Sequence, residues 1–167
     1  MKKFIFLFIS VFIFSCSSVY NVQHSKIKKE DSFVVIPFKN NTETPLAGLR
    51  ASSIVKGVLG SRGYNIRDIF TDIPERDLTD REIKSLLQES KNKGIRYAVV
   101  GDVNEWRYKT GIDGEPAVSL SMRIIDLETG KIVWVATGSK SGWGHQSLGV
   151  VAQDLINDIL DKVNKDK

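Results

Sequence analysis

Residues 97–136 read YAVVGDVNEW RYKTGIDGEP AVSLSMRIID LETGKIVWVA, and this stretch decides the fold. From Val118 to Ile124, apolar side chains alternate with more polar ones, which is the pattern of a strand with one buried face. Turns at 111–115 and 128–130 separate this strand from a longer one before it and a shorter one after it. The stretch therefore predicts an antiparallel meander of three strands.

The first strand of this meander, residues 97–108, has two apolar faces. Simple alternation places Val99 and Val103 on one face and Ala98 on the other. The same count places Trp106 on the face of Ala98. Apolar residues on both faces indicate a central strand that is covered on both sides.

Two strands and one helix are expected before the meander. Residues 33–38 form an apolar run that is typical of a short buried strand. Thr44, followed by Pro45, predicts the start of a helix whose apolar positions run from Ala47 to Val58. Residues 64–69 alternate weakly and predict a second short strand.

Two more helices complete the pattern. Thr79 and Glu82 have the spacing of a capping box, so they predict the start of a helix that ends at Gly94. Apolar positions between Leu148 and Val163 predict a final amphipathic helix. The expected order is β-α-β-α-β-β-β-α, which is one α/β (α+β) domain over 32–167. It has a mixed sheet of about five strands and three helices.

The N-terminus has the pattern of a lipoprotein signal. A basic start, Met1–Lys3, precedes the apolar run Phe4–Phe14, which as a helix would span only about 16 Å of a ~30 Å bilayer core. We therefore expect residues 1–15 to be a signal peptide and not a spanning helix. Residues 13–16, Ile-Phe-Ser-Cys, resemble a bacterial lipobox, which implies cleavage before Cys16 and a diacylglycerol on its sulfur. An ordinary secretory signal with an incidental cysteine is the alternative.

A lipid on Cys16 would set the location of the protein. Each buried CH₂ contributes ~0.8 kcal/mol, so two or more acyl chains give a firm anchor. Ser17 at the next position favours sorting to the outer membrane, by analogy with Gram-negative systems. The polar residues 16–31 are expected to be the lipidated cysteine and a flexible tether with a reach of ~20 Å. The covalent lipid is the only cofactor-like group that we expect.

The composition argues against several classes of function. The 167 residues carry a formal net charge of +4, and removal of Lys2 and Lys3 leaves 22 basic and 20 acidic residues, or +2. That balance is too weak to indicate binding to nucleic acid. One cysteine and two histidines leave little material for a metal site or for disulfides. The chain has no phosphate loop, GxSxG, HExxH or CxxC motif, so we expect no enzyme, no catalytic residue and no metal ligand.

Two short stretches stand out from this background. In Ser141–Gly144, Trp143 is flanked by glycines, so it either packs into the core or projects as an aromatic anchor at a membrane interface. Gly111–Pro116 is an acidic turn that contains Asp113. It is either a solvated hairpin or, in a ring of identical subunits, one member of a circle of negative charge that attracts cations.

Three ordered stretches resemble the PelC family, the outer-membrane lipoproteins that take part in export of the biofilm exopolysaccharide Pel. The similarity runs from about Phe33 to Ile159 and is weak between 64 and 95. The stretches are Asn40–Gly48, Glu105–Lys109 with Asp113–Val118, and Ser141–Trp143 with Val151–Gln153.

The resemblance implies a function without catalysis. Members of the family are lipid-anchored and assemble into a dodecameric ring on the periplasmic face of the outer membrane, beneath the β-barrel of the partner PelB. An electronegative funnel is thought to guide the partly cationic polysaccharide to the pore. By this resemblance Cys16 is the lipidated residue, Asp113 the acidic residue of the funnel, and Trp143 a membrane-facing aromatic.

A second interpretation belongs to another class of protein. Lipoproteins with a similar order of strands and helices bind other envelope machines, as activators of peptidoglycan synthases or as transport auxiliaries. Such a protein would be a monomeric binding module of the outer membrane and would need no acidic ring. The oligomeric state distinguishes this interpretation from the first.

Overall fold

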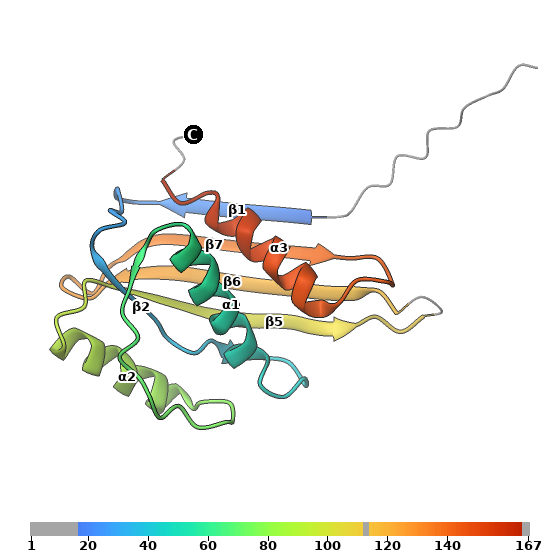
Figure 1. Ribbon diagram of the computed structural model, residues 1–167, viewed down its shortest axis with the longest axis horizontal. Helices are drawn as coiled ribbons and strands as arrows, with labels where there is room; N and C mark the ends of the chain where they lie inside the picture. Colours follow the sequence, from blue (N-terminus) through green and yellow to red (C-terminus); the bar gives the residue numbers. More distant parts are fainter. Residues whose placement is uncertain (1–16, 112–113, 165–167) are drawn as a thin grey trace, which may run out of the picture.

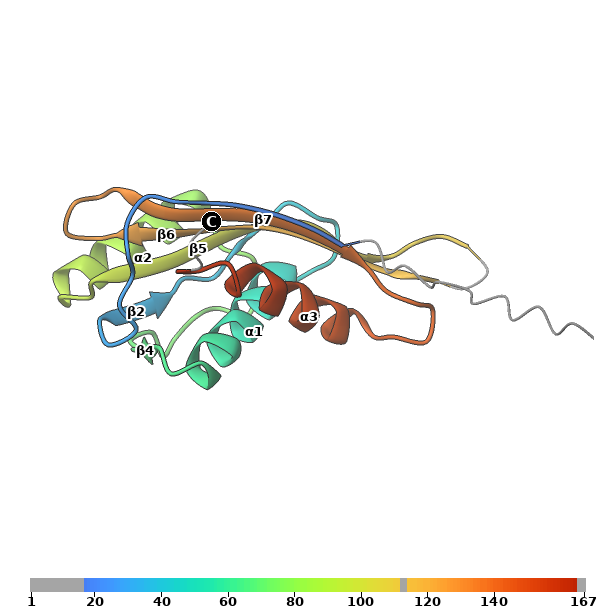
Figure 2. The same ribbon diagram turned by 90° about the horizontal axis from the view of Figure 1, so that it is seen from above.

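The computed structural model describes residues 17–111 and 114–164. One mixed sheet of seven strands forms a single layer, and helices α1 and α3 lie side by side on one of its faces (Figures 1 and 2). The elements in chain order are β1 (Ser17–Gln23), β2 (Ser32–Val35), β3 (Lys39–Asn40), α1 (Ala47–Ser61), β4 (Asn65–Ile66), α2 (Asp80–Asn92), β5 (Tyr97–Tyr108), β6 (Pro116–Asp126), β7 (Ile132–Ser141) and α3 (Leu148–Leu160).

The sheet has the spatial order β1-β7-β6-β5-β2-β4, with β3 also pairing with β5. Strands β5, β6, β7 and β1 are antiparallel neighbours, whereas β2, β3 and β4 pair in parallel. The predicted α+β class, the meander and the order of helices and strands are confirmed, with β1 and β3 as additional strands. Among the described residues, no helix combines the length and the hydrophobicity needed to span a bilayer.

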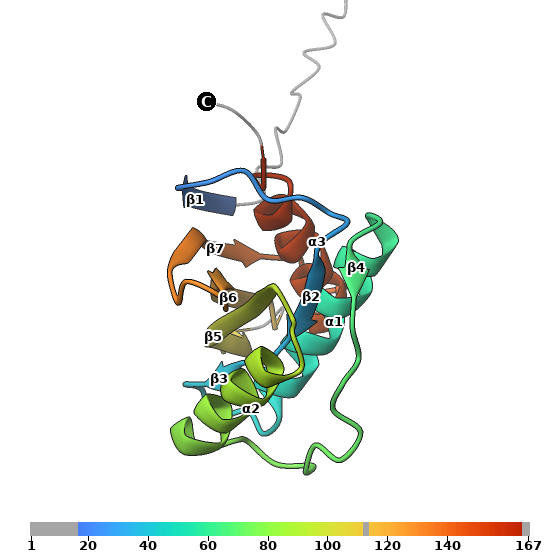
Figure 3. The same ribbon diagram turned by 90° about the vertical axis from the view of Figure 1, so that its left-hand side faces the viewer.

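The two faces of the sheet are covered differently. The main core lies between the sheet and α1 with α3, and Leu120, Met122 and Trp134 are fully buried in it. A smaller core on the opposite face joins β2 and β5 to α2 (Figure 3). No helix formed by the described residues covers the part of that face over β6, β7 and β1. We call this part the open face; its outward side chains include Tyr20, Val22, Ser119, Ser121, Arg123, Val135, Thr137 and Ser139.

Polar side chains bond to one another across the open face. The hydroxyls of Ser121 and Thr137 are 3.0 Å apart, and Ser139 Oγ donates to Ser119 Oγ at 2.9 Å. Arg123 Nη2 lies 2.9 Å from Asp102 Oδ2 on the neighbouring strand. Cross-strand pairs of this kind stabilise a sheet whose surface stays in water.

The segment expected to be a flexible tether is structured, so that prediction is wrong for residues 17–23. They form β1, which pairs with β7 along its whole length. Further on, Ile27 is buried, and its backbone N–H donates to Asn164 Oδ1 at 3.0 Å. The strand forms because β7 offers it a free edge 111 or more residues away in sequence, which a polar local composition does not reveal. Cys16 and residues 1–15 lie outside the described residues.

Two further expectations fail for reasons that depend on tertiary contacts. Helix α1 starts at Ala47, with Leu46 in the left-handed region at φ 62°, and not at Thr44. The hydroxyl of Thr44 donates instead to the backbone oxygen of Trp106 at 2.5 Å. A bulge between Val103 and Glu105 reverses the alternation in β5, so Trp106 joins the face of Val103 and not that of Ala98.

Local signals were more accurate elsewhere. The capping box at Thr79 and Glu82 is confirmed, with both of its reciprocal bonds present.

The predicted strand at 64–69 is shorter than expected, because only the two residues of β4 pair in the sheet. Strand β7 runs on through Gly138, where an added Cβ would come within 3.0 Å of Leu155, so the glycine allows α3 to pack closely against the sheet.

Candidate functional site

One end of the sheet brings together features that are far apart in sequence. Ser17 pairs with Lys140, Lys140 with Val118, and Val118 with Trp106, so these four residues form one row across the strands. The β5–β6 hairpin and the β7–α3 loop both extend beyond this row, at the same end of the molecule (Figure 1). We call this end of the molecule, with Ser17 and residues 109–111, 114–115 and 142–147, the hairpin end.

The β7–α3 loop is held firmly and presents Trp143 to the outside. Gly142 donates its N–H to the oxygen of Pro116 at 2.8 Å, and an added Cβ on Gly142 would lie 2.4 Å from Val151. The backbone N–H of Trp143 donates to Gln146 Oε1 at 2.8 Å. With 44% of its surface exposed, Trp143 lies on the outside of the molecule and not in the core. The side-chain hydroxyl of Ser147 then caps α3.

In the acidic turn, the basic side chain of Lys109 lies beside the carboxylate of Glu115. The backbone N–H of Lys109 donates to the oxygen of Glu115 at 2.7 Å and closes the hairpin. Lys109 Nζ donates to Ser141 Oγ at 2.8 Å and lies 3.8 Å from Glu115 Oε2. Asp113, the acidic residue singled out in the sequence, lies outside the described residues. The hairpin is therefore tied to the end of β7, the strand that leads to Trp143.

The loop between β3 and α1 owes its shape to Asn40. Asn40 Oδ1 accepts the backbone N–H of Thr42 at 3.0 Å and its hydroxyl at 2.8 Å, and Asn40 Nδ2 donates to the oxygen of Thr44 at 2.8 Å. Gly48 then lets α1 approach the preceding strand, since an added Cβ would lie 2.0 Å from the oxygen of Phe38. These residues determine the shape of the loop. The Asn-x-Thr spacing at 40–42 is typical of an Asx-turn, so the sequence carried a signal for this loop that the expectations above did not include.

This loop forms one wall of a polar groove that reaches Ser119 and Ser139 on the open face. The groove has a volume of about 730 Å³, and its lining includes Asn41, Glu43, Asn104, Glu105 and Arg107. Trp106 contributes to the wall but is buried, so it offers no free ring for stacking. The groove can therefore supply hydrogen bonds and charge to a polar ligand, but no aromatic platform.

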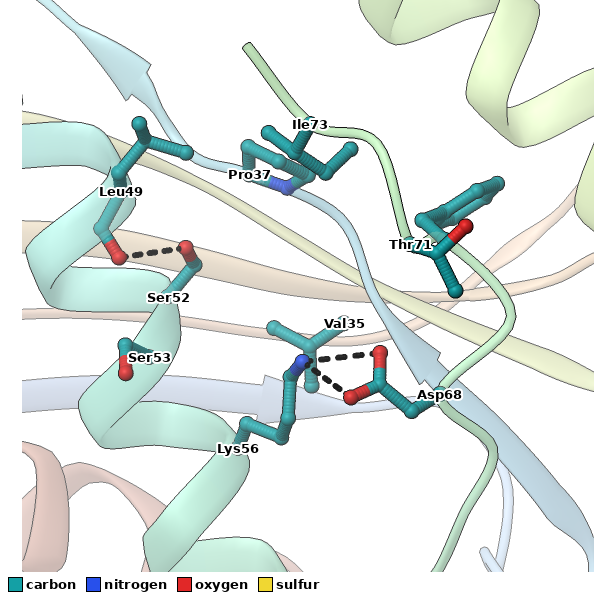
Figure 4. A pocket seen from close by; sticks show the side chains of 10 residues that line it. Val35, Pro37, Leu49, Ser52, Ser53, Lys56, Asp68, Thr71 and Ile73 are labelled. Carbon is teal, nitrogen blue, oxygen red and sulfur yellow. Dashed lines mark hydrogen bonds and ion pairs between the residues drawn. The ribbon is translucent and has the colours of Figure 1, made fainter. Parts of the chain in front are cut away.

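A smaller pocket of about 280 Å³ lies between α1 and the segment that follows β4 (Figure 4). Its charged groups are already paired, with Lys56 Nζ 3.0 Å from Asp68 Oδ1, and Ser52 Oγ donates to the backbone oxygen of Leu49 at 3.0 Å. A hydroxyl that donates to a main-chain carbonyl is not activated as a nucleophile, which would require a neighbouring base. The hydroxyl of Ser52 is therefore not activated in this pocket.

The remaining candidate groups have structural or surface positions. Asp126 is buried. Its Oδ1 accepts the N–H groups of Glu128 at 3.0 Å and Thr129 at 3.1 Å, and its Oδ2 accepts from Arg96 at 2.6 Å, so it caps the β6–β7 turn. His145 is exposed. Within residues 17–111 and 114–164, no cluster of three or more His, Cys, Asp and Glu side chains could hold a metal ion.

Comparisons with known proteins give one clear group of relatives. A PelC dodecamer from Paraburkholderia phytofirmans is 32% identical, over 91% of this chain and 100% of that chain, with a TM-score of 0.74. A dodecamer of a PelC variant from the same organism is also 32% identical, over 87% and 96% of the two chains, with a TM-score of 0.72.

The wider comparisons add only the fold. The lipoprotein GNA1162 from Neisseria meningitidis is 17% identical over 79% of this chain and 99% of that chain, with a TM-score of 0.52, so it shares the fold. No protein-family model and no curated protein matches the chain.

Proposed function

The chain belongs to the PelC family, and on that premise we propose that it is a lipid-anchored, non-enzymatic subunit of a Pel exopolysaccharide secretion complex at the periplasmic face of the outer membrane. The observation that carries the proposal is the similarity to PelC in both sequence and fold, which spans 91% of this chain and all of its relative.

The proposed assembly is a closed ring of identical subunits. It follows the dodecamers formed by the PelC relatives, and a head-to-tail contact between copies closes into a ring when its rotation permits. In such a ring each subunit contributes one Asp113, and twelve carboxylates around one opening would attract a cationic polymer. A PelB-like β-barrel is the proposed outer-membrane partner that receives the polysaccharide.

The position of β1 gives this proposal a defined orientation. Cys16 precedes Ser17 directly, and Ser17 pairs with Lys140, three residues before Trp143. A lipid on Cys16 would therefore join the chain at the hairpin end and hold that end against the membrane, without a long tether. Trp143 is exposed there, and an indole ring suits the membrane–water interface. Twelve lipids in one ring would bind the membrane with high avidity.

Complementation of a strain that lacks this gene tests the proposal. The wild-type chain should restore secretion of the polysaccharide, measured as cell-free polymer, and should fractionate with the outer membrane. Cys16→Ala should instead leave the chain soluble in the periplasm and reduce secretion. Normal polymer secretion in the deletion strain, together with altered peptidoglycan synthesis, would overturn the proposal in favour of a regulator of another envelope machine.

A further inference from the structure

Strand β1 has an unprotected outer edge. In the described part of the chain, β7 is the only strand that pairs with β1, so one side of seven residues presents unpaired backbone groups. Its sequence, SSVYNVQ, contains no charged residue and no proline. Natural proteins protect edges with such residues, with bulges, or by covering the edge, because bare edges pair with other chains. A bare edge of this length indicates that something covers it in the functional state.

The opposite edge of the sheet shows the usual protection. Strands β3 and β4 have only two residues each. The side chain of Lys39 in β3 lies 2.9 Å from Asp80 Oδ1, and Asn40 Nδ2 donates to Asp77 Oδ2 at 3.0 Å, so a charged segment covers this edge. The contrast between the two edges singles out β1 as the contact surface.

Apolar side chains lie next to the bare edge. Tyr20 and Val22 are 72% and 49% exposed, and both project from the open face because they pair with Thr137 and Val135. They line a recess of about 490 Å³ with Val135 and Thr137. Cores of protein interfaces favour aromatic residues and few charges, and this surface has both properties.

A second surface with little charge lies on the opposite layer of the molecule. It is a recess of about 710 Å³ between the N-terminal ends of α1 and α3, lined by Leu46, Leu49, Ile54, Tyr108 and Leu148, with Arg50 as its only charged residue. Ser53 lies at its edge on α1, and Gly57 follows one turn later. A Cβ on Gly57 would meet nothing within 4 Å, so packing inside this chain does not require glycine there, although glycine weakens a helix.

We infer that these two surfaces are the two halves of the contact between neighbouring copies of this chain. The β1 edge with Tyr20 and Val22 of one copy would pack on the α1–α3 recess of the next, which brings helices over the bare edge. A ring built head to tail needs two different surfaces on each subunit, and the PelC relatives are dodecamers. Two nearly uncharged surfaces also pay little for desolvation. The inference rests on the proposed ring.

Native mass spectrometry of the full chain, purified in mild detergent, tests the inference. The wild type should give a mass of twelve copies. Tyr20→Arg with Val22→Arg, and separately Ser53→Arg, should each reduce the assembly to the mass of a single mature chain while circular dichroism stays unchanged. Ile132→Arg is the matched control, because it places the same charge on an exposed apolar residue of the sheet beyond the last β1–β7 pair, and it should keep the ring.

Mixing the two ring-breaking variants gives the sharper result. Each keeps one intact half of the contact, so an equimolar mixture, with one variant isotope-labelled, should form pairs containing one copy of each and nothing larger. Intact rings in either variant, a mixture that stays monomeric, or loss of the ring in Ile132→Arg would overturn the inference and leave the proposed ring standing. A wild-type chain that stays monomeric in detergent and in membranes would overturn the ring itself.

Discussion

Gly48 and Gly57 lie in the same helix, and replacing each by alanine should change the stability in opposite directions. At Gly48 an added Cβ would lie 2.0 Å from the oxygen and 3.0 Å from the carbon of the Phe38 carbonyl. Both neighbours are backbone atoms, which cannot rotate away as a side chain would. Cβ atoms essentially never come closer than 3.0 Å to another heavy atom, so α1 and the segment before β3 would have to separate by about 1 Å.

The magnitude follows from two opposing terms. Alanine improves the helix by ~1 kcal/mol relative to glycine. Overpacking against a rigid neighbour costs ~1–3 kcal/mol, and a backbone neighbour puts Gly48→Ala at the upper end. The net loss is then about 2 kcal/mol, or about 4–8 °C in Tm for a domain of this size. Gly57→Ala meets no neighbour and keeps the whole helix gain, so its Tm should rise by about 2–4 °C.

The assay is thermal and chemical unfolding of the full chain, followed by circular dichroism at a concentration where wild type and variants are all monomeric. The common assembly state matters because association raises the apparent stability. A Gly48→Ala chain as stable as the wild type would refute the close approach of α1 to Phe38. A Gly57→Ala chain less stable than the wild type would refute the conclusion that space around Gly57 is free within one subunit.

Three further predictions use other contacts. Trp134→Ala, at a fully buried position, should cost ~3–5 kcal/mol, whereas Trp143→Ala should lower Tm much less but reduce membrane retention; equal losses of Tm would contradict the surface position of Trp143. Bonds from Arg76, then from Thr79, lower the pKa of Glu82 from 4.5 to about 2, so its contribution is present above pH 4.5 and is lost as the pH falls toward 2. The protection of backbone amides from hydrogen exchange at the start of α2, relative to their intrinsic rates at each pH, should fall over that range, and the Glu82→Gln variant should show no such fall. Asp113→Lys should reduce secreted polysaccharide without dispersing the ring; unchanged secretion would argue against the funnel.

Features encoded by neighbouring residues were predicted accurately. The Thr79–Glu82 capping box and the buried alternation from Val118 to Ile124 both depend on contacts within one helix or one strand. The order of helices and strands followed from such signals, and three short stretches sufficed for the resemblance to PelC. The lipobox at Cys16 is also a local signal, and its lipid remains a prediction.

Features that depend on distant partners could not be found in this way. Thr44 does not cap α1, because its hydroxyl donates to the backbone carbonyl of Trp106, 62 residues away. Asp126 is buried beside Arg96, the residue before β5, whose Nη2 donates to Asp126 Oδ2 at 2.6 Å. The bulge after Val103 moved Trp106 to the other face, because one extra residue reverses every later position in a period of two.

The sequence by itself determined the order of the helices, the meander and the family resemblance, because each depends on residues that are close along the chain. Only the tertiary structure decided that Ser17 lies beside Lys140, that Trp143 is exposed at that same end, and that β1 is left with a bare edge. The physical reason is that strand pairing joins residues more than 100 positions apart through backbone groups, which are the same in every residue type except proline. Their choice of partner is fixed by which edges and faces the rest of the fold leaves uncovered.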